Sequence, residues 1–176
     1  FWQPALVICD YDTFATLPDL KIMDGVSEAI KHAVVSDATL LNHIICNDYE
    51  YVIGRCVSIK KSVVEADERD TGIRQLLNFG HTVGHCIEKL SAFSVSHGQA
   101  IAKGMVVEAC AAYKMGLTKT DISGELKDIL TKLGFDLSVP YESGQIYHYA
   151  LIDKKIAGDK ISLVIPDSIG KCHLQK

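Results

Sequence analysis

The sequence predicts a mainly α fold: a multi-helix domain with a short strand near its start and a β-hairpin near its end. Apolar residues recur every three to four positions from about residue 20 to residue 152, which is the spacing of helices. Strand-like runs are confined to the two ends of the chain. With 176 residues, of which 48% are hydrophobic, the chain is long enough to bury a core.

The first expected element is a strand over Ala5–Cys9, a continuous apolar run that stops at Asp10. Residues 10–18 follow as a connector. Because one strand is not stable alone, we expect it to pair with the C-terminal hairpin or with a sheet outside this sequence. The chain opens without Met, and we expect it to be part of a longer protein.

The expected helices follow in order, and polar caps or glycines mark several of their ends. Asp48 or a neighbour caps the third helix and Thr71 the fourth, while Gly116 and Gly134 end the fifth and sixth. The expected ranges are 20–36, 38–45, 48–67, 71–90, 99–115, 121–133 and 143–152. Strands over 160–166 and 170–174, on either side of residues 167 and 168, predict the terminal hairpin.

Composition narrows the function classes. The net charge is −4 with no long run of Lys or Arg, so we do not expect a nucleic-acid partner. No apolar run approaches 18 residues, so we expect no membrane partner. Six cysteines without a CxxC pair predict reduced core thiols in a cytoplasmic protein rather than a disulfide framework.

The most informative residues are Arg74, Asn78, His81 and His85, which are spaced i, i+4, i+7 and i+11. This spacing places all four on one face of a helix. A solvated face usually carries Lys and Glu, and a glycine precedes each of these histidines, which suggests close packing against the backbone. The pattern therefore favours a metal or anion site over a solvated surface.

Taken alone, the i, i+4 spacing makes His81 and His85 a candidate metal pair, without the Glu of an HExxH motif. Glu28 and His97 are the candidates for a third ligand. Glu28 lies among apolar residues, where a carboxylate is costly to bury unless it is paired or binds a cation. The remaining histidines are interpreted as surface or satisfied residues: His32, His43, His148 and His173.

Cations gather in the same part of the sequence, which predicts an anionic substrate with a phosphate or carboxylate group. These cations are Lys31, Arg55, Lys60, Lys61, Arg69 and Arg74. No GxGxxG or GxxxxGK[ST] motif is present, so the sequence carries neither a dinucleotide-binding nor a P-loop fingerprint.

Several motifs, in order along nearly the whole chain, resemble the 3-dehydroquinate synthase family. They are Gln3-Pro4, Thr16-Leu17-Pro18, Gly25 to Lys31, Ser58 to Asp70, Gly72 to Arg74, Leu77 to His85, His97 to Met105 and Asp153-Lys154-Lys155. The resemblance implies a two-domain enzyme with an NAD-binding α/β domain followed by a helical domain. Residues 1–17 would then be the last strand and connector of the missing N-terminal domain, and residues 18–176 the metal- and substrate-binding domain.

The resemblance also assigns roles to residues. Glu28, His81 and His97 match the family's ligands for Zn²⁺ (or Co²⁺), which leaves His85 as a proton acceptor in contact with substrate. Catalytic roles fall to His85, Asp70 and Lys60, although Asp70 stands where the family usually has Glu. The implied substrate-binding residues are Glu28, Lys31, Lys60, Arg74, Asn78, His85, His97 and one of Lys154 and Lys155. The implied NAD contacts are Thr13, Phe14, Ala15 and Thr16, and two of these, Thr13 and Phe14, differ from the family's usual residues.

The implied reaction converts 3-deoxy-D-arabino-heptulosonate 7-phosphate to 3-dehydroquinate and phosphate, a lyase step of the shikimate pathway to aromatic amino acids. It combines transient oxidation by NAD, β-elimination of phosphate, reduction and aldol closure, with zinc acting as a Lewis acid. We expect a cytoplasmic homodimer, and an isolated chain that is inactive without its NAD domain. The alternatives are another sugar-phosphate cyclase, such as a 2-deoxy-scyllo-inosose synthase, or a helical metal-binding module without catalysis.

Overall fold

The computed structural model describes residues 4–155 and 162–175, with side chains described for 4–151 and 162–175. It is mainly helical with a C-terminal hairpin, as the sequence predicts. In chain order the elements are the 3-10 helix η1 (Tyr11–Thr16), helices α1 (Asp19–Ser36), α2 (Leu40–Ile45) and α3 (Tyr49–Ala66), the 3-10 helix η2 (Ile73–Asn78), helices α4 (His81–Leu90), α5 (His97–Lys114), α6 (Ser123–Lys132) and α7 (Ser143–Lys155), and strands β1 (Leu163–Ser168) and β2 (Lys171–Gln175).

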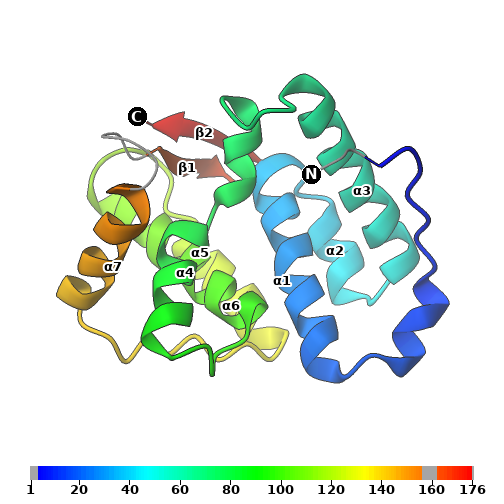
Figure 1. The fold of residues 1–176 in the computed structure, drawn as a ribbon, viewed down its shortest axis with the longest axis horizontal. Helices are drawn as coiled ribbons and strands as arrows, with labels where there is room; N and C mark the ends of the chain where they lie inside the picture. The colour runs from blue at the N-terminus through cyan, green and yellow to red at the C-terminus, as the bar shows by residue number, and fades with distance from the viewer. Residues whose placement is uncertain (1–3, 156–161, 176) are drawn as a thin grey trace.

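Helix α5 is the centre of the arrangement. It packs against α1, α4, α6 and β1. Figure 1 shows α1, α2 and α3 on one side of the molecule and α4 to α7 on the other, with the antiparallel β1–β2 hairpin at one end. Within the described ranges, no helix is long and apolar enough to cross a membrane.

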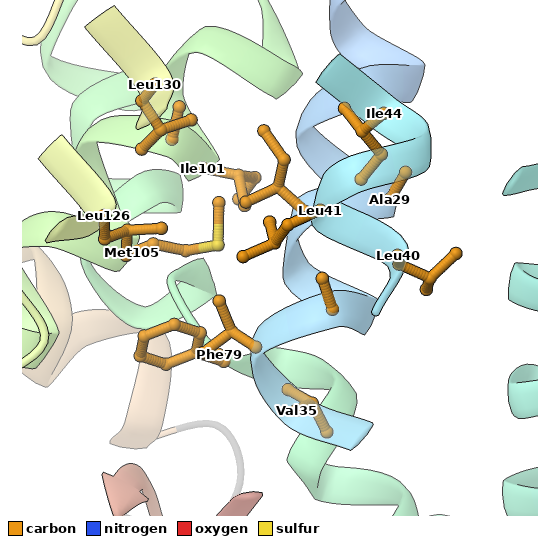
Figure 2. Packing of buried hydrophobic residues seen from close by; sticks show 14 of the residues in the cluster. Ala29, Val35, Leu40, Leu41, Ile44, Phe79, Ile101, Met105, Leu126 and Leu130 are labelled. Atoms are coloured by element: carbon orange, nitrogen blue, oxygen red, sulfur yellow. The ribbon is translucent and has the colours of Figure 1, made fainter. Parts of the chain in front are cut away.

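The core fills the space between these two groups of helices. Ile101 and Met105 of α5 are fully buried, with Leu126 and Leu130 of α6 on one side and α2 on the other (Figure 2). Phe79, just before α4, is also fully buried. Each such side chain contributes about 1.5–3 kcal/mol when it leaves water, so α5 is fixed on several sides at once.

Most expected helix ends are confirmed. Asp48 caps α3, where its carboxylate accepts the backbone N–H of Tyr51 at 3.4 Å. Gly116 and Gly134 follow the ends of α5 and α6 within two residues. The hairpin turn lies at residues 169–170 rather than at 167–168, because Gly170 takes a φ of +90° and donates its N–H to Val34 of α1.

The prediction of a strand over Ala5–Cys9 is wrong. These residues form no strand, and the only sheet in the described part of the chain is the β1–β2 pair. Leu6 is 76% exposed and Ile8 is 81% exposed. An apolar run forms a buried strand only where another strand or layer covers it, and no described element covers this one.

The prediction of a single helix over residues 71–90 is also wrong, because the helical conformation is interrupted at Gly80. There φ is +79°, and a Cβ atom at this position would meet the Met105 side chain at 2.5 Å. Glycine permits this left-handed conformation and the close approach of α5. Thr71 caps no helix; it donates its own N–H to the Asp67 carboxylate.

The six cysteines are free thiols, as predicted, but they are not all core residues. Cys86 is buried, whereas Cys9 and Cys46 are exposed. Cys9 belongs to the uncovered apolar run, and Cys46 follows the last residue of α2. The apolar neighbours of these two cysteines in sequence therefore misled the interpretation.

Glycines set the distance between α4 and α5. A Cβ atom on Gly104 would lie 2.0 Å from the Gly80 carbonyl oxygen and 2.8 Å from the Gly84 nitrogen. A Cβ atom on Gly84 would meet the Ile101 side chain at 2.7 Å. Because the obstacles include backbone atoms, a side chain at either position would force the two helices apart.

We therefore expect Gly104→Ala to lower the free energy of unfolding by about 3 kcal/mol, the upper part of the range for overpacked cores. Gly124→Ala in α6 is the control, since nothing lies within 4 Å of its added Cβ, and its stability should be equal or slightly higher. Urea unfolding followed by circular dichroism measures both. Equal stabilities for the two variants would contradict the close helix contact.

A buried lysine gives a second prediction. Lys103 of α5 is 4% exposed, and its ammonium donates to Asp136 at 3.1 Å and to the Ser138 carbonyl at 2.6 Å. The N–H and hydroxyl of Ser138, together with Lys103, lower the pKa of Asp136 to about 2. A folded pKa below the unfolded value of about 3.9 contributes stability above pH 4 that is lost as the pH falls toward 2.

Accordingly, Asp136→Asn should lower the free energy of unfolding at pH 7, and its deficit should shrink between about pH 4 and about pH 2. Urea unfolding at a series of pH values measures this. Asp128→Asn, at an exposed position of α6, is the control and should differ little from the parent protein. A deficit that stays constant across the pH series would show that the Asp136 charge does not contribute.

Candidate metal and substrate site

Three helices bring together the side chains that could hold a metal ion. His81 and His97 are the first residues of α4 and α5, and Glu28 comes from the middle of α1. The Glu28 Oε1 atom lies 3.7 Å from Nε2 of each histidine. One ligand atom from each residue falls within 4.8 Å of the other two.

Hydrogen bonds determine which nitrogen of each imidazole faces the cluster. Nδ1 of His81 lies 3.2 Å from the Phe79 carbonyl oxygen, and Nδ1 of His97 lies 3.1 Å from Glu88 Oε1. Since both partners are acceptors, both Nδ1 atoms carry the proton and each Nε2 keeps its lone pair. The Glu28 Oε1 atom toward which they point is buried without a hydrogen-bond donor.

The cluster suits a divalent cation. Burial and the Lys31 charge lower the pKa of His81 to about 4, so its imidazole is neutral at pH 7 and forms no ion pair with Glu28. Two nitrogen lone pairs and a carboxylate oxygen would otherwise face one another without a positive charge between them. A tetrahedral zinc with bonds of about 2.1 Å places its ligand atoms about 3.4 Å apart, close to the observed 3.7 Å.

The second oxygen of Glu28 is held by Lys31, one turn later on α1. Oε2 accepts from the Lys31 ammonium at 2.6 Å. Burial acts to raise the pKa of Glu28, but Lys31 and the two histidines outweigh it and hold that pKa below its usual range. Burial also lowers the pKa of Lys31. Glu28 is therefore an anion that can face a cation on one side and Lys31 on the other.

Two further carboxylates hold the beginnings of α4 and α5. Asp24 of α1 accepts the Gly98 N–H at 2.9 Å. Glu108 of α5 accepts from the Gly80 N–H at 2.8 Å and from the Val83 N–H at 3.0 Å. Each carboxylate satisfies N–H groups that the first turn of a helix leaves unpaired. Helices that carry His81 and His97 at their starts are thereby anchored to their neighbours.

A polar pocket of about 260 Å³ opens beside this cluster. Three cations line it, and the complete lining is Glu28, Lys31, His32, Lys60, Asp70, Arg74, Leu77, Asn78 and His81. The charge and the volume suit a small anionic molecule, since lysine and arginine donate to phosphate and carboxylate oxygens.

The loop before η2 shapes one wall of the pocket. The Asp67 carboxylate accepts the backbone N–H groups of Thr71, Gly72 and Arg74 at 2.8–3.1 Å. These N–H groups lower the pKa of Asp67 in spite of the opposing effect of desolvation. Within the same loop Asp70 has a φ of +58°.

The predicted stripe of four polar residues is split between two elements, but three of its members still meet at the pocket. Arg74 and Asn78 reach it from η2, and His81 reaches it from α4. His85 does not line the pocket; its ring centre lies 5.3 Å from His81 and 6.1 Å from His97. The pairing of His81 with His85 is not favoured, because the three possible ligands that come together around His81 in the described residues are Glu28, His81 and His97.

Other predicted residues lie elsewhere. Arg55 pairs with Asp37 at 2.6 Å, Lys61 pairs with Glu65 at 3.8 Å, and Arg69 does not line the pocket. The predicted NAD contacts, residues 13–16, form most of η1 and are exposed apart from partly buried Phe14. Lys154 and Lys155 lie at the end of α7, and their side chains are outside the described residues.

The sequence interpretation missed His32, Asp24, Glu88 and Glu108. His32 was interpreted as a surface or satisfied histidine, but it is only 6% exposed and is therefore not a surface residue. Its hydrogen bonds are satisfied in part, because Nδ1 bonds the Glu28 carbonyl while Nε2 has no hydrogen-bond partner. Glu108 sits among apolar residues, the signal that identified Glu28. Asp24 lies one turn before Glu28, and Glu88 lies one turn after His85. Both stand on helices that the sequence had already assigned to the site.

Comparison with known proteins gives the family context. A family model described as 3-dehydroquinate synthase C-terminal matches residues 25–156. The curated 3-dehydroquinate synthases of Dictyoglomus thermophilum and Thermodesulfovibrio yellowstonii are 36% and 37% identical to the chain, over 99% of its length and 52% of theirs. The chain therefore spans about half the length of the curated relatives it matches.

Solved structures share the fold. One is a 2-epi-5-epi-valiolone synthase from Streptomyces hygroscopicus with NAD⁺ and Zn²⁺ bound, with a TM-score of 0.81 and 22% identity over 94% of this chain and 50% of that one. Another is a 2-deoxy-scyllo-inosose synthase complexed with carbaglucose-6-phosphate, NAD⁺ and Co²⁺, with a TM-score of 0.71 and 24% identity over 92% and 48%. At these identities the likeness shows the fold alone.

The metal cluster makes a direct prediction. In the complete natural protein, Glu28→Gln, His81→Ala and His97→Ala should each abolish zinc binding, because each removes one of three protein ligands. His85→Ala should leave the bound zinc in place. Atomic absorption on purified protein measures the metal per chain. Loss of zinc in the His85 variant, as complete as in the others, would instead favour the His81–His85 pair.

Proposed function

The chain belongs to the 3-dehydroquinate synthase C-terminal family, and we propose that the protein containing it is a 3-dehydroquinate synthase. The reaction converts 3-deoxy-D-arabino-heptulosonate 7-phosphate to 3-dehydroquinate and phosphate. The observation that carries the proposal is the juxtaposition of a Glu28–His81–His97 cluster with a pocket lined by Lys31, Lys60 and Arg74. Four curated relatives at 35–37% identity are 3-dehydroquinate synthases, which favours this substrate over those of other sugar-phosphate cyclases.

Glu28, His81 and His97 would hold Zn²⁺ or Co²⁺. When bound, the metal would supply a Lewis acid for the substrate hydroxyl groups. Two observations support this assignment: the buried Glu28 Oε1 has no hydrogen-bond donor, and both histidines direct a bare Nε2 atom toward it.

The other pocket residues bind and orient the substrate. Lys60 and Arg74 would hold the phosphate and carboxylate groups through charged hydrogen bonds, and Asn78 would fix a hydroxyl. Arg74 is held in place by its bond to the Glu68 carbonyl at 2.9 Å. Lys31 contributes positive charge to the pocket without being the main substrate contact, since its side chain is 5% exposed and already paired with Glu28.

Proton acceptors are needed when the oxidised substrate loses a proton and phosphate. We assign this role to His85, whose ring lies beside both ligand histidines, and to Asp70, which lines the pocket. Asp is one methylene shorter than the family's usual Glu, and the place of Asp70 in the pocket lining is what would allow its carboxylate to reach a bound substrate.

When bound, NAD⁺ would supply a hydride acceptor whose reduced form can return the hydride, so the proposed reaction needs a nucleotide site as well as the metal. We propose that residues 1–17 belong to the boundary with an NAD-binding domain and that residues 18–176 form the metal and substrate domain. The exposed η1 segment at residues 13–16 and the uncovered apolar run at 5–9 support such a boundary. A homodimeric state, a cytoplasmic location and inactivity of the isolated chain stay predictions.

Adjacent lysines test the proposal in the complete natural protein. Lys60→Met should lower kcat/KM for the heptulosonate phosphate on the order of 10- to 100-fold, because it removes a charged hydrogen bond from a pocket residue. Lys61→Met is the matched control, since Lys61 pairs with Glu65 on the surface and should leave turnover unchanged. Phosphate release and 3-dehydroquinate formation are followed in the presence of NAD and zinc.

The same assay identifies the substrate. The parent protein should turn over the heptulosonate phosphate and leave hexose phosphates unchanged. Turnover of a hexose phosphate alone would assign the protein to another cyclase activity, and no turnover of any sugar phosphate would favour a metal-binding module without catalysis.

A further inference from the structure

Glu88 of α4 lies against His97 and has no assigned role. We propose that Glu88 is a positioning residue for the metal site: it holds the Nδ1–H group of His97 and thereby aims Nε2 of that imidazole at Glu28. This inference rests on the proposed metal site and adds to it a residue outside the three ligands.

The two nitrogens of His97 face two different carboxylates. Nδ1 lies 3.1 Å from Glu88 Oε1, and Nε2 lies 3.7 Å from Glu28 Oε1. A carboxylate can only accept, so the hydrogen bond to Glu88 places the proton on Nδ1. Metal-binding histidines commonly donate their second N–H in this way, which fixes both the tautomer and the ring plane.

His97 needs such a partner more than His81 does. The His81 side chain is 14% exposed, and its Nδ1 atom is held by the carbonyl of its own chain two residues earlier. The His97 side chain is 43% exposed and stands at the first position of α5. Among the described residues, Glu88 is the partner within hydrogen-bond distance of the His97 Nδ1 atom.

The fold places Glu88 where it can do this. It stands seven residues after His81, which is two helical turns along nearly the same face of α4. The glycine contacts draw α4 against α5, and the loop at 91–96 returns the chain to His97. With only 15% of its side chain exposed, Glu88 is a mostly buried carboxylate directed at an imidazole rather than at solvent.

A competing arrangement uses the same atoms differently. His85, Glu88 and His97 also present ligand atoms within 4.8 Å of one another, so Glu88 could in principle be a ligand itself. Two observations favour positioning. Glu88 Oε1 already accepts a hydrogen bond, whereas Glu28 Oε1 has no donor, and the Nδ1 proton of His97 would have to leave before that nitrogen could bind a cation.

The test is titration of the complete natural protein with Co²⁺, whose absorption spectrum reports the ligand set. Glu88→Ala should weaken Co²⁺ binding about 10- to 100-fold, the usual effect of removing such a partner. Binding should remain one ion per chain with the parent spectrum. Glu88→Gln keeps an acceptor oxygen and should recover most of the affinity. Glu65→Gln, a surface change on α3, is the control and should bind like the parent.

Each outcome has a distinct meaning. A metal-free Glu88→Ala protein that unfolds at the parent temperature but binds Co²⁺ weakly supports positioning, because a purely structural role would lower stability instead. Affinity equal to the parent overturns the inference while leaving the metal site intact. Two ions per chain in the parent, with one lost in both Glu88→Ala and His85→Ala, would make Glu88 a ligand. A parent protein that binds no Co²⁺ overturns the metal site itself.

Discussion

The site depends on carboxylates that tie the start of one helix to the side of another. Asp24 of α1 holds the first turn of α5, and Glu108 of α5 holds the first turn of α4. Because His97 and His81 are the first residues of these helices, the two bonds fix where both imidazoles begin. Gly104 then brings the α4 and α5 backbones into contact. Without these anchors, three separate helices would not converge on one point.

The same carboxylates also reduce the electrostatic repulsion between a bound cation and the starts of two helices. The beginning of a helix carries a partial positive charge, so a cation between two helix starts would be repelled by both. Asp24 and Glu108 place negative charge on those starts, and Glu28 adds a third carboxylate whose pKa is held below its usual range. Lys31 balances Glu28 from its other oxygen at 2.6 Å. Negative charge at the helix starts and positive charge in the pocket lining therefore come from different side chains.

Helix content and the polar residues were predictable from sequence because both depend on local spacing. Glu28 among apolar neighbours and the glycine-histidine pairs indicated side chains that the structure brings together, although the conformation at Gly80 turns the predicted continuous stripe into two elements. The anchors were not predictable: Glu108 pairs with Gly80, 28 residues away, and such distant pairs leave no periodic signal. The prediction of a strand at residues 5–9 was wrong for a related reason, since burial of that run depends on a layer that the described residues do not contain.

Metal and substrate sites are joined through α1. Glu28 and Lys31 are one turn apart on the same rigid helix and share a hydrogen bond, so the position of one sets the position of the other. A cation bound by Glu28, His81 and His97 would link α1, α4 and α5 and would stabilise the arrangement in which Lys31 and Lys60 both line the pocket. Metal binding would therefore help the anion pocket to keep its shape, in addition to any chemistry the ion contributes. The anchors, the ligands and the cationic lining act as one structural unit, because α1 carries a member of each set and α5 carries both an anchor and a ligand.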